Sequence, residues 1–268
     1  MTDWDNVAPA WDRFVDEADE PTAAATARLV DALRPAAGDR VLELAAGPGP
    51  LAALWSELVG PAGTVEITDL SLEMVALARR RAELPNVEVA VLDASAIDRP
   101  DSSVDVVAVR MGLMFTPDPA VALAEIRRVL APGGRLGALT WAGPEHNPWI
   151  TCVGMAAMVN GIVAGGPPVG PGGIFSLGDP TQLEQLAERA GFADVTVELD
   201  EVTFHADSVN AHIDRVTALA GPLARALADG TPEQRAAVRR TAAELAAPHV
   251  TDRGVELPGR ALRMVARR

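Results

Sequence analysis

The sequence predicts an α/β fold: an open, doubly wound, mostly parallel sheet of seven strands with N-terminal helices and an inserted helical cap. Three observations support this prediction. Short apolar segments alternate with helical patterns between residues 39 and 142. The connections between them are short. Residues 104–109 are almost continuously apolar, which is typical of a central parallel strand buried on both faces.

The first half of the chain can be assigned in order. Residues 7–34 carry two apolar stripes at helical spacing and are predicted to be helical. The first five strands are predicted at 40–44, 64–68, 87–92, 104–109 and 135–141. A helix at about 50–59 follows the first strand, with Leu51, Leu54, Trp55 and Leu58 on one face. Ser71 is a suitable N-cap for the next helix, and a third helix has Leu123, Ile126 and Leu130 in register.

The second half alternates less regularly. Further helices are predicted at 150–164, 180–190, 207–228 and 232–247, and further strands at 194–204 and 255–266. Residues 165–173 contain only glycine, proline and one valine, so we expect a mobile loop over the carboxyl edge of the sheet. Thr231 to Gln234 form a capping-box pattern that begins the last helix.

These elements divide the chain into six parts. They are an N-terminal helical lid (1–35), a ligand-binding core (36–142), a cap helix with the Gly/Pro loop (143–180), a core helix and strand (181–206), an inserted helical hairpin (207–250) and the last strand (251–268).

Composition excludes several classes of function. A formal net charge of −14 argues against nucleic acid or an anionic membrane as a partner. The chain has neither lysine nor tyrosine, which excludes Schiff-base lysine chemistry and tyrosine acid/base catalysis. Its one cysteine, Cys152, lies among apolar residues and is predicted to be a buried thiol. We expect no metal site, no membrane span and, from the acidic N-terminus, a cytoplasmic location.

The segment after the first strand predicts a nucleotide-like ligand. An apolar strand ends in an acid at Glu43, turns through Gly47 and Gly49, and enters a helix. Such a turn lets the backbone approach a ligand at the carboxyl end of a parallel strand. With Ala52 and Asp69, the segment also fits a dinucleotide fingerprint.

Two prolines favour a ligand without a phosphate at this turn. Pro48 and Pro50 each remove a backbone N–H group from the loop. A pyrophosphate needs those donors at the start of the helix. An NAD-dependent oxidoreductase is therefore the less favoured alternative, and a binding protein without turnover is another.

Five segments together resemble the class I S-adenosylmethionine-dependent methyltransferases, and most closely the ubiquinone/menaquinone-biosynthesis C-methyltransferase-like branch. They are Val41-Leu-Glu-Leu-Ala-Ala-Gly-Pro-Gly49, Thr68-Asp-Leu-Ser-Leu-Glu-Met74, Leu92-Asp-Ala94, Arg128-Val-Leu-Ala-Pro-Gly-Gly-Arg-Leu136 and Ala190-Gly-Phe-Ala-Asp-Val195. The resemblance spans roughly residues 39–200 and implies a Rossmann-like, S-adenosylmethionine-binding core with S-adenosylhomocysteine as the product. Ala45 replaces the first glycine of the family motif.

The resemblance also implies roles for single residues. Glu43 would interact with the methionyl ammonium, and Gly47 and Gly49 would let the backbone approach the ligand. Asp69 would accept hydrogen bonds from both ribose hydroxyls, although capping the following helix is its alternative role. The remaining expected contacts are Leu70 and Met74 beside the adenine, Asp93 and Ala94 at its polar edge, and Arg110 and Met111 at the methionine tail and methyl group.

Three residues are further candidates, and the roles of Trp11 and Arg110 have open alternatives. Trp11 is expected to close over the sulfonium, since aromatic faces attract cations, or else to pack a terminal helix on the sheet. Arg110 contacts the ligand or forms a structural ion pair. His146, in the segment after the fifth strand, is the best candidate for a general base if the acceptor must lose a proton.

The expected function is methyl transfer by in-line displacement to a small-molecule acceptor, quinone-like, polyketide or another natural product. The alternative is a cyclase of the same fold that uses the sulfonium as a fixed cation without transferring the methyl group. Within the protein, the main tasks are to align the acceptor with the methyl group and to exclude water. A homodimer is possible.

Overall fold

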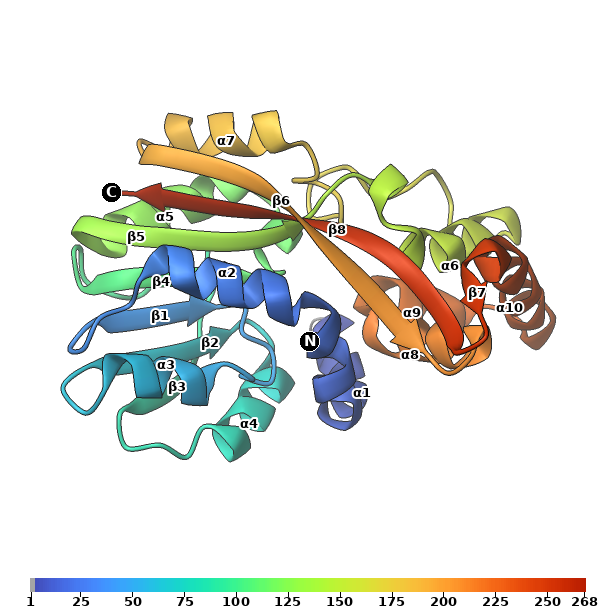
Figure 1. The fold of residues 1–268 in the computed structure, drawn as a ribbon, viewed down its shortest axis with the longest axis horizontal. Helices are drawn as coiled ribbons and strands as arrows, with labels where there is room; N and C mark the ends of the chain where they lie inside the picture. The colour runs from blue at the N-terminus through green and yellow to red at the C-terminus, as the bar shows by residue number, and fades with distance from the viewer. Residues whose placement is uncertain (1–2) are drawn as a thin grey trace.

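The computed structural model describes residues 3–268, and its central feature is a twisted mixed sheet (Figure 1). Seven strands follow the order β3-β2-β1-β4-β5-β8-β6, and a short strand, β7, pairs with β8. The strands are β1 (Arg40–Leu44), β2 (Thr64–Asp69), β3 (Val87–Val91), β4 (Val104–Arg110), β5 (Leu130–Trp141), β6 (Ala193–Ala206), β7 (Val250–Thr251) and β8 (Gly254–Arg267). The five strands from β3 to β5 are parallel, and β8 is antiparallel to both β5 and β6. The predicted doubly wound α/β fold is confirmed.

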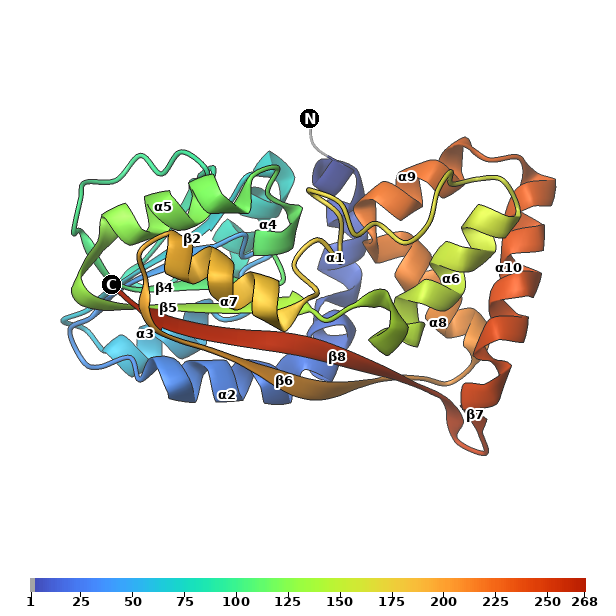
Figure 2. The same cartoon turned by 90° about the horizontal axis from the view of Figure 1, so that it is seen from above.

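Helices cover both faces of this sheet. They are α1 (Asp3–Asp19), α2 (Ala23–Leu33), α3 (Ala52–Val59), α4 (Leu72–Arg81), α5 (Pro119–Val129), α6 (Pro148–Val159), α7 (Pro180–Arg189), α8 (Val209–Leu219), α9 (Gly221–Asp229) and α10 (Pro232–Ala246). Seen from above, α2 and α3 lie on one side of the sheet and α5 and α7 on the other (Figure 2). Short 3₁₀ turns are η1 (Glu20–Thr22), η2 (Leu113–Phe115), η3 (Pro144–His146) and η4 (Ala247–His249).

The helices begin where side-chain oxygens cap them. The Ser71 hydroxyl accepts from the Met74 amide at the start of α4, as predicted. Asp118 and Asp179 cap α5 and α7 in the same way, each followed by a proline at the first helical position. Thr231 forms the predicted reciprocal capping box with Gln234. Local sequence therefore fixes the ends of these helices.

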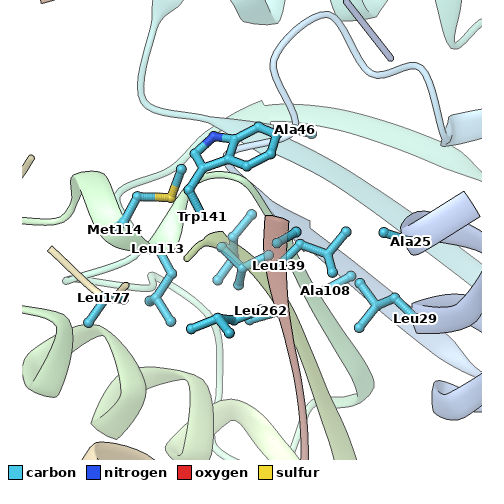
Figure 3. Packing of buried hydrophobic residues seen from close by; sticks show 14 of the residues in the cluster. Ala25, Leu29, Ala46, Ala108, Leu113, Met114, Leu139, Trp141, Leu177 and Leu262 are labelled. Carbon is cyan, nitrogen blue, oxygen red and sulfur yellow. The ribbon is translucent and has the colours of Figure 1, made fainter. Parts of the chain in front are cut away.

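The core lies on both faces of the central strands. Figure 3 shows Ala25 and Leu29 of α2 on one side of the sheet residues Ala108 and Leu139, with Leu113 on the other side. All five side chains are at most 1% exposed. Burying a leucine or isoleucine side chain contributes about 1.5–3 kcal/mol, so this core holds the strand ends at fixed positions.

The cap and the lid stand beside the carboxyl end of the parallel strands. Helices α6, α8, α9 and α10 gather around the far ends of β6 and β8, and α1 lies between them and the core (Figures 1 and 2). Helix α1 contacts α4 on the core side and α8 and α9 on the cap side. The Gly/Pro loop 165–173 has no helix or strand, as predicted, and Ser176 just beyond it donates from its hydroxyl to the Met114 carbonyl oxygen.

Three predicted boundaries are wrong, and one short strand was not predicted. The single helix expected at 207–228 is broken at Ala220, because Pro222 lacks the N–H that a continuous helix needs there. The helix expected to reach residue 164 ends at Val159, six residues before the glycine-rich loop. The fifth strand begins at Leu130, which pairs with Val104 before a register shift. Finally, the two-residue strand β7, which pairs with β8, was not predicted because a strand this short has no periodic pattern.

No helix within residues 3–268 has the length and apolar character needed to cross a bilayer.

Candidate functional site

The register of the parallel strands brings the predicted ligand-binding residues to one edge of the sheet. Glu43 aligns with Ile67 of β2 and with Ala108 of β4. Asp69 aligns with Val91 of β3. Asp69 and Arg110 are the last residues of β2 and β4, Glu43 is the last but one of β1, and Asp93 follows β3. Since parallel strands end on the same side, these residues lie at one edge of the sheet.

Glu43 is a buried carboxylate with one oxygen bonded and one without a partner. Its side chain is 0% exposed, and Oε2 accepts a hydrogen bond of 2.8 Å from the indole Nε1 of Trp55. Oε1 is buried and has no hydrogen-bond partner. Burial raises the pKa of Glu43 to about 7, while the nearby Arg110 charge and the Trp55 hydrogen bond act in the opposite direction. A buried carboxylate oxygen without a donor is costly, and it suits a cationic ligand.

Arg110 joins this cluster from the end of β4. Its guanidinium forms an ion pair with Asp19 at the end of α1. Its Nε is buried and has no hydrogen-bond partner. The open alternative for Arg110 therefore has a partial answer: the ion pair exists, and the Nε donor has no partner.

The glycine turn is held closed by Asp69. Its Oδ2 accepts from the Gly47 amide and its Oδ1 from the Ser71 amide, each at 2.8 Å. Burial raises the pKa of Asp69, and these two backbone hydrogen bonds act against that rise. Each carboxylate oxygen keeps a second acceptor position. Asp69 thus shapes the turn and caps α4, and it can still accept from a ligand.

The turn has few donors for a phosphate. The Ala46 amide donates to the Thr68 carbonyl oxygen, and the Gly49 amide donates to that of Ala46. The Gly47 amide is bonded to Asp69, and Pro48 and Pro50 have no N–H. This agrees with the sequence-based preference for a ligand without a phosphate at the turn.

Left-handed backbone conformations cluster at the same strand ends. Ala45 has a φ of 51° and Met111 a φ of 55°, a region that non-glycine residues rarely adopt. A Cβ on Gly112 would lie 2.3 Å from that of Ala45, so the two loops approach as closely as glycine permits. Conformations of this kind are often kept at functional sites. Ala45, where the family has glycine, is accommodated in this conformation.

The adenine end of the predicted site is open. Leu70 is 54% exposed directly after Asp69, and Val91 is 42% exposed at the end of β3. Asp93 is exposed, and its Oδ1 accepts from the Ser95 amide; Ala94 is half-buried next to it. An exposed apolar side chain beside exposed carboxylate oxygens suits a flat heteroaromatic ring with an amino group.

Of two further predicted ligand residues, Met74 lies against the lid helix α1 and Trp11 belongs to it. Met74 is 2% exposed and clusters with Val7 and Ala8 of α1. The Trp11 indole Nε1 donates to the Leu219 carbonyl oxygen of α8 at 3.2 Å. In this arrangement both side chains fasten α1 to its neighbours, and their predicted contacts with adenine and sulfonium stay predictions.

The histidines and the cysteine differ in environment. His146 lies in η3, with its side chain 37% exposed and Nε2 3.4 Å from a Glu145 carboxylate oxygen. His212 is fully buried, its Nε2 lies 2.6 Å from the Trp149 carbonyl oxygen, and burial lowers its pKa to about 4. Cys152 is buried as predicted, and burial raises the pKa of its thiol to about 11. Of these two histidines, His146 is therefore the one that is accessible to solvent or to an acceptor.

No group of three or more histidine, cysteine, aspartate or glutamate side chains in the described range 3–268 is arranged to hold a metal ion.

The two glycines of the turn should respond differently to alanine. Both have positive φ, 58° for Gly47 and 72° for Gly49, so each substitution costs about 1 kcal/mol in backbone strain. A Cβ on Gly49 would also lie 3.2 Å from the Ala78 Cβ and 3.3 Å from the Ile67 Cγ2, whereas on Gly47 it would meet nothing within 4 Å. We expect Gly49→Ala to lower the unfolding free energy more, and Gly47→Ala to weaken ligand binding more. Urea unfolding and ligand titration of both variants check this; the same order in both measurements would contradict it.

The sheet order, the glycine turn after β1 and the polar residues at successive strand ends are the features that the resemblance to class I methyltransferases implies. Residues 41–134 match the family model described as "Methyltransferase domain". This part of the chain is similar to methyltransferase domains, and the predicted resemblance to the class I S-adenosylmethionine-dependent methyltransferases is confirmed.

Relatives and solved structures agree with this assignment. A 114-residue segment, 41% of the chain, is 38% identical to the ubiquinone/menaquinone biosynthesis C-methyltransferase UbiE of Teredinibacter turnerae and covers 46% of that protein. A putative methyltransferase from Bacillus halodurans C-125 matches 90% of the chain and 97% of its own, with a TM-score of 0.62 and 20% identity. The [4+2]-cyclase SpnF matches 91% of the chain and 80% of its own, with a TM-score of 0.54 and 22% identity. At these identities the structural likeness concerns the fold.

The matched segments span less than half of the curated relatives, between 32% and 47% of their lengths. The comparison therefore concerns a part of each relative. The cap helices α8, α9 and α10 lie outside the family model.

Sequence reasoning missed two residues of the site. Trp55 was assigned only to the apolar face of a helix, and Asp19 was not singled out. A signal for Trp55 exists in hindsight: a buried indole needs an acceptor, and a buried acid at a strand end needs a donor. Asp19 is brought to Arg110 by the packing of α1, which no local pattern specifies.

Proposed function

We propose that this protein binds S-adenosylmethionine at the ends of β1 to β4 and transfers its methyl group to a small-molecule acceptor. The observation that carries the proposal is the pair of unpartnered buried atoms, Oε1 of Glu43 and Nε of Arg110. One is an acceptor and the other a donor, and they belong to residues at the ends of adjacent strands. An α-amino acid group has the matching charges: an ammonium for Glu43 and a carboxylate for Arg110.

The remaining strand ends fit the adenosine part of the same ligand. Asp69 keeps free acceptor positions for the ribose hydroxyls, and the open space beside Gly47 allows close approach. The exposed Leu70 offers a face for the adenine, with Asp93 and the Ala94 amide at its edge. Met111, at the end of β4, would lie near the methyl group. These are the roles that the family resemblance implies for the same positions.

When bound, the sulfonium supplies the electrophilic methyl group. The chain's own contribution is to hold the amino acid group at Glu43 and Arg110, to orient the acceptor in line and to exclude water. Helix α1 and the loop 165–173 lie over this edge of the sheet and supply that enclosure (Figure 2). His146 accepts a proton where the acceptor must lose one, since its imidazole is accessible.

The acceptor is proposed to be an apolar small molecule such as a quinol or a polyketide. The support is the apolar composition of α6, where Trp149, Ile150, Val153 and Ala157 are buried and Met155 is 43% exposed. A cap of this composition favours an apolar acceptor and does not name its ring system.

Product mass tests the proposal. The protein is incubated with S-adenosylmethionine and a panel of quinols and polyketides, and the products are analysed by mass spectrometry. We expect an acceptor that gains one methylene in mass, with one S-adenosylhomocysteine formed per product. An isomerised acceptor with intact S-adenosylmethionine would replace transfer by the cyclase alternative, and failure of the protein to bind either cofactor form would refute both.

A further inference from the structure

The helix that follows the glycine turn places one large polar side chain behind the site. Trp55 is the fourth residue of α3 and is 0% exposed. Its indole Nε1 donates to Oε2 of Glu43 at 2.8 Å. Both groups are fully buried, so solvent does not compete for this hydrogen bond.

The chemistry of the indole makes this contact one-sided. An indole N–H donates and cannot accept, so this group gives a cationic ligand no hydrogen-bond acceptor. The indole N–H donates to one oxygen of the Glu43 carboxylate, and the other oxygen, Oε1, is buried without a donor. Arg110 does not fill that position, because its guanidinium is paired with Asp19 and its Nε has no partner.

We propose that Trp55 is a positioning residue: its N–H fixes the Glu43 carboxylate so that Oε1 alone faces the ammonium group of the ligand. The inference rests on the proposed function, since it assigns the ligand a cationic group at Glu43. Without the indole donor, the carboxylate can rotate and its charged form loses a buried hydrogen bond. Both changes weaken the ionised state that a cation needs.

Charge around Glu43 provides a readout that a purely structural role would not change. The charged groups that act on Glu43 are Arg110 from β4 and Asp19 from α1. The Trp55 hydrogen bond lowers the Glu43 pKa, which burial raises to about 7. Removing that hydrogen bond, while both charged groups stay, moves the midpoint of the pH dependence of ligand binding upward.

The experiment compares Trp55→Phe with the wild type in calorimetric titrations of S-adenosylhomocysteine across neutral pH. We expect about tenfold weaker binding at pH 7 and an upward move of the midpoint by about one pH unit, the size of a hydrogen bond to a charged group. Trp149→Phe is the matched control, because it also removes a buried indole donor, here to Asn147 Oδ1 at 3.0 Å. It should leave the midpoint where it is.

A Glu43→Gln background completes the test. There, Trp55→Phe should cause no further change in pH dependence, since the titrating group is gone. An unchanged midpoint in Trp55→Phe would overturn the inference while the wild type still binds the ligand. Absence of binding by the wild type would instead overturn the proposed function. If Trp55→Phe does not fold, benzothienylalanine at position 55 keeps the ring volume without the N–H, and the same midpoint decides.

Discussion

Replacing Glu43 by glutamine is expected to weaken binding of S-adenosylmethionine and S-adenosylhomocysteine by ten- to a hundredfold at pH 8. The buried Oε1 has no protein donor and is proposed to accept from the ligand ammonium. A hydrogen bond between charged groups contributes about 1.5–3 kcal/mol, which corresponds to that range. Calorimetric titration of both proteins measures the change.

The loss should depend on pH in a defined direction. The pKa of Glu43 is about 7, so its carboxylate ionises as pH rises through neutrality. A cationic ligand prefers the ionised form, so wild-type affinity should increase from pH 6 to pH 8 and then level. Glu43→Gln should show a smaller increase. Glu57→Gln, an exposed acid on α3, is the control and should behave as the wild type; a pH profile shared by all three proteins would contradict this role of Glu43.

The second expected result concerns stability: Glu43 and His212 should impose opposite pH dependences that largely cancel in the wild type. Burial raises the pKa of Glu43 to about 7 from 4.5 and lowers that of His212 to about 4 from 6.5. Both shifts favour the uncharged form in the folded protein. Each amounts to about 3 kcal/mol of unfolding free energy across its window.

The signs follow from proton binding. Between pH 4.5 and 7 the folded protein holds the Glu43 proton more tightly than the unfolded chain, so this contribution is lost as pH rises. Between pH 6.5 and 4 the unfolded chain binds a proton at His212 that the folded protein excludes, so this contribution is lost as pH falls. Relative to the wild type, Glu43→Gln should therefore gain stability as pH rises, and His212→Gln as pH falls.

Urea unfolding at several pH values measures both slopes. Differences from the wild type remove the contribution of the other carboxylates, since the substituted sites are separate. His205→Gln is the control, because that side chain is 55% exposed. Parallel profiles for Glu43→Gln, His212→Gln and the wild type would contradict the burial argument for both residues.

Much of the core was predictable because each of its signals is local. The apolar run at β4, the Ser71 cap and the Thr231 capping box each specify an element within a few residues, and the structure has all three. The placement of Glu43 and Asp69 at one edge follows from the parallel topology alone. The position of the candidate cofactor site could therefore be predicted from the predicted ends of the parallel strands.

The rest depends on contacts between distant segments. Trp11 donates a hydrogen bond to Leu219, and Asp19 forms an ion pair with Arg110. The partners in each pair are far apart in the sequence, so no local pattern predicts these contacts. Met74 has the spacing of a ligand residue, yet its side chain is buried against α1. The break between α8 and α9 at Ala220 does have a local signal, because Pro222 follows two residues later. The homodimer and the cytoplasmic location stay predictions.

The most direct test of the account is a pair of calorimetric titrations of the wild-type protein, one with S-adenosylhomocysteine and one with NAD⁺. The strand-end carboxylates and the proline-containing turn predict saturable binding of S-adenosylhomocysteine at one site per chain, lost in Asp69→Ala, and no binding of NAD⁺. Binding of NAD⁺ at this site, or no binding of S-adenosylhomocysteine, would contradict it.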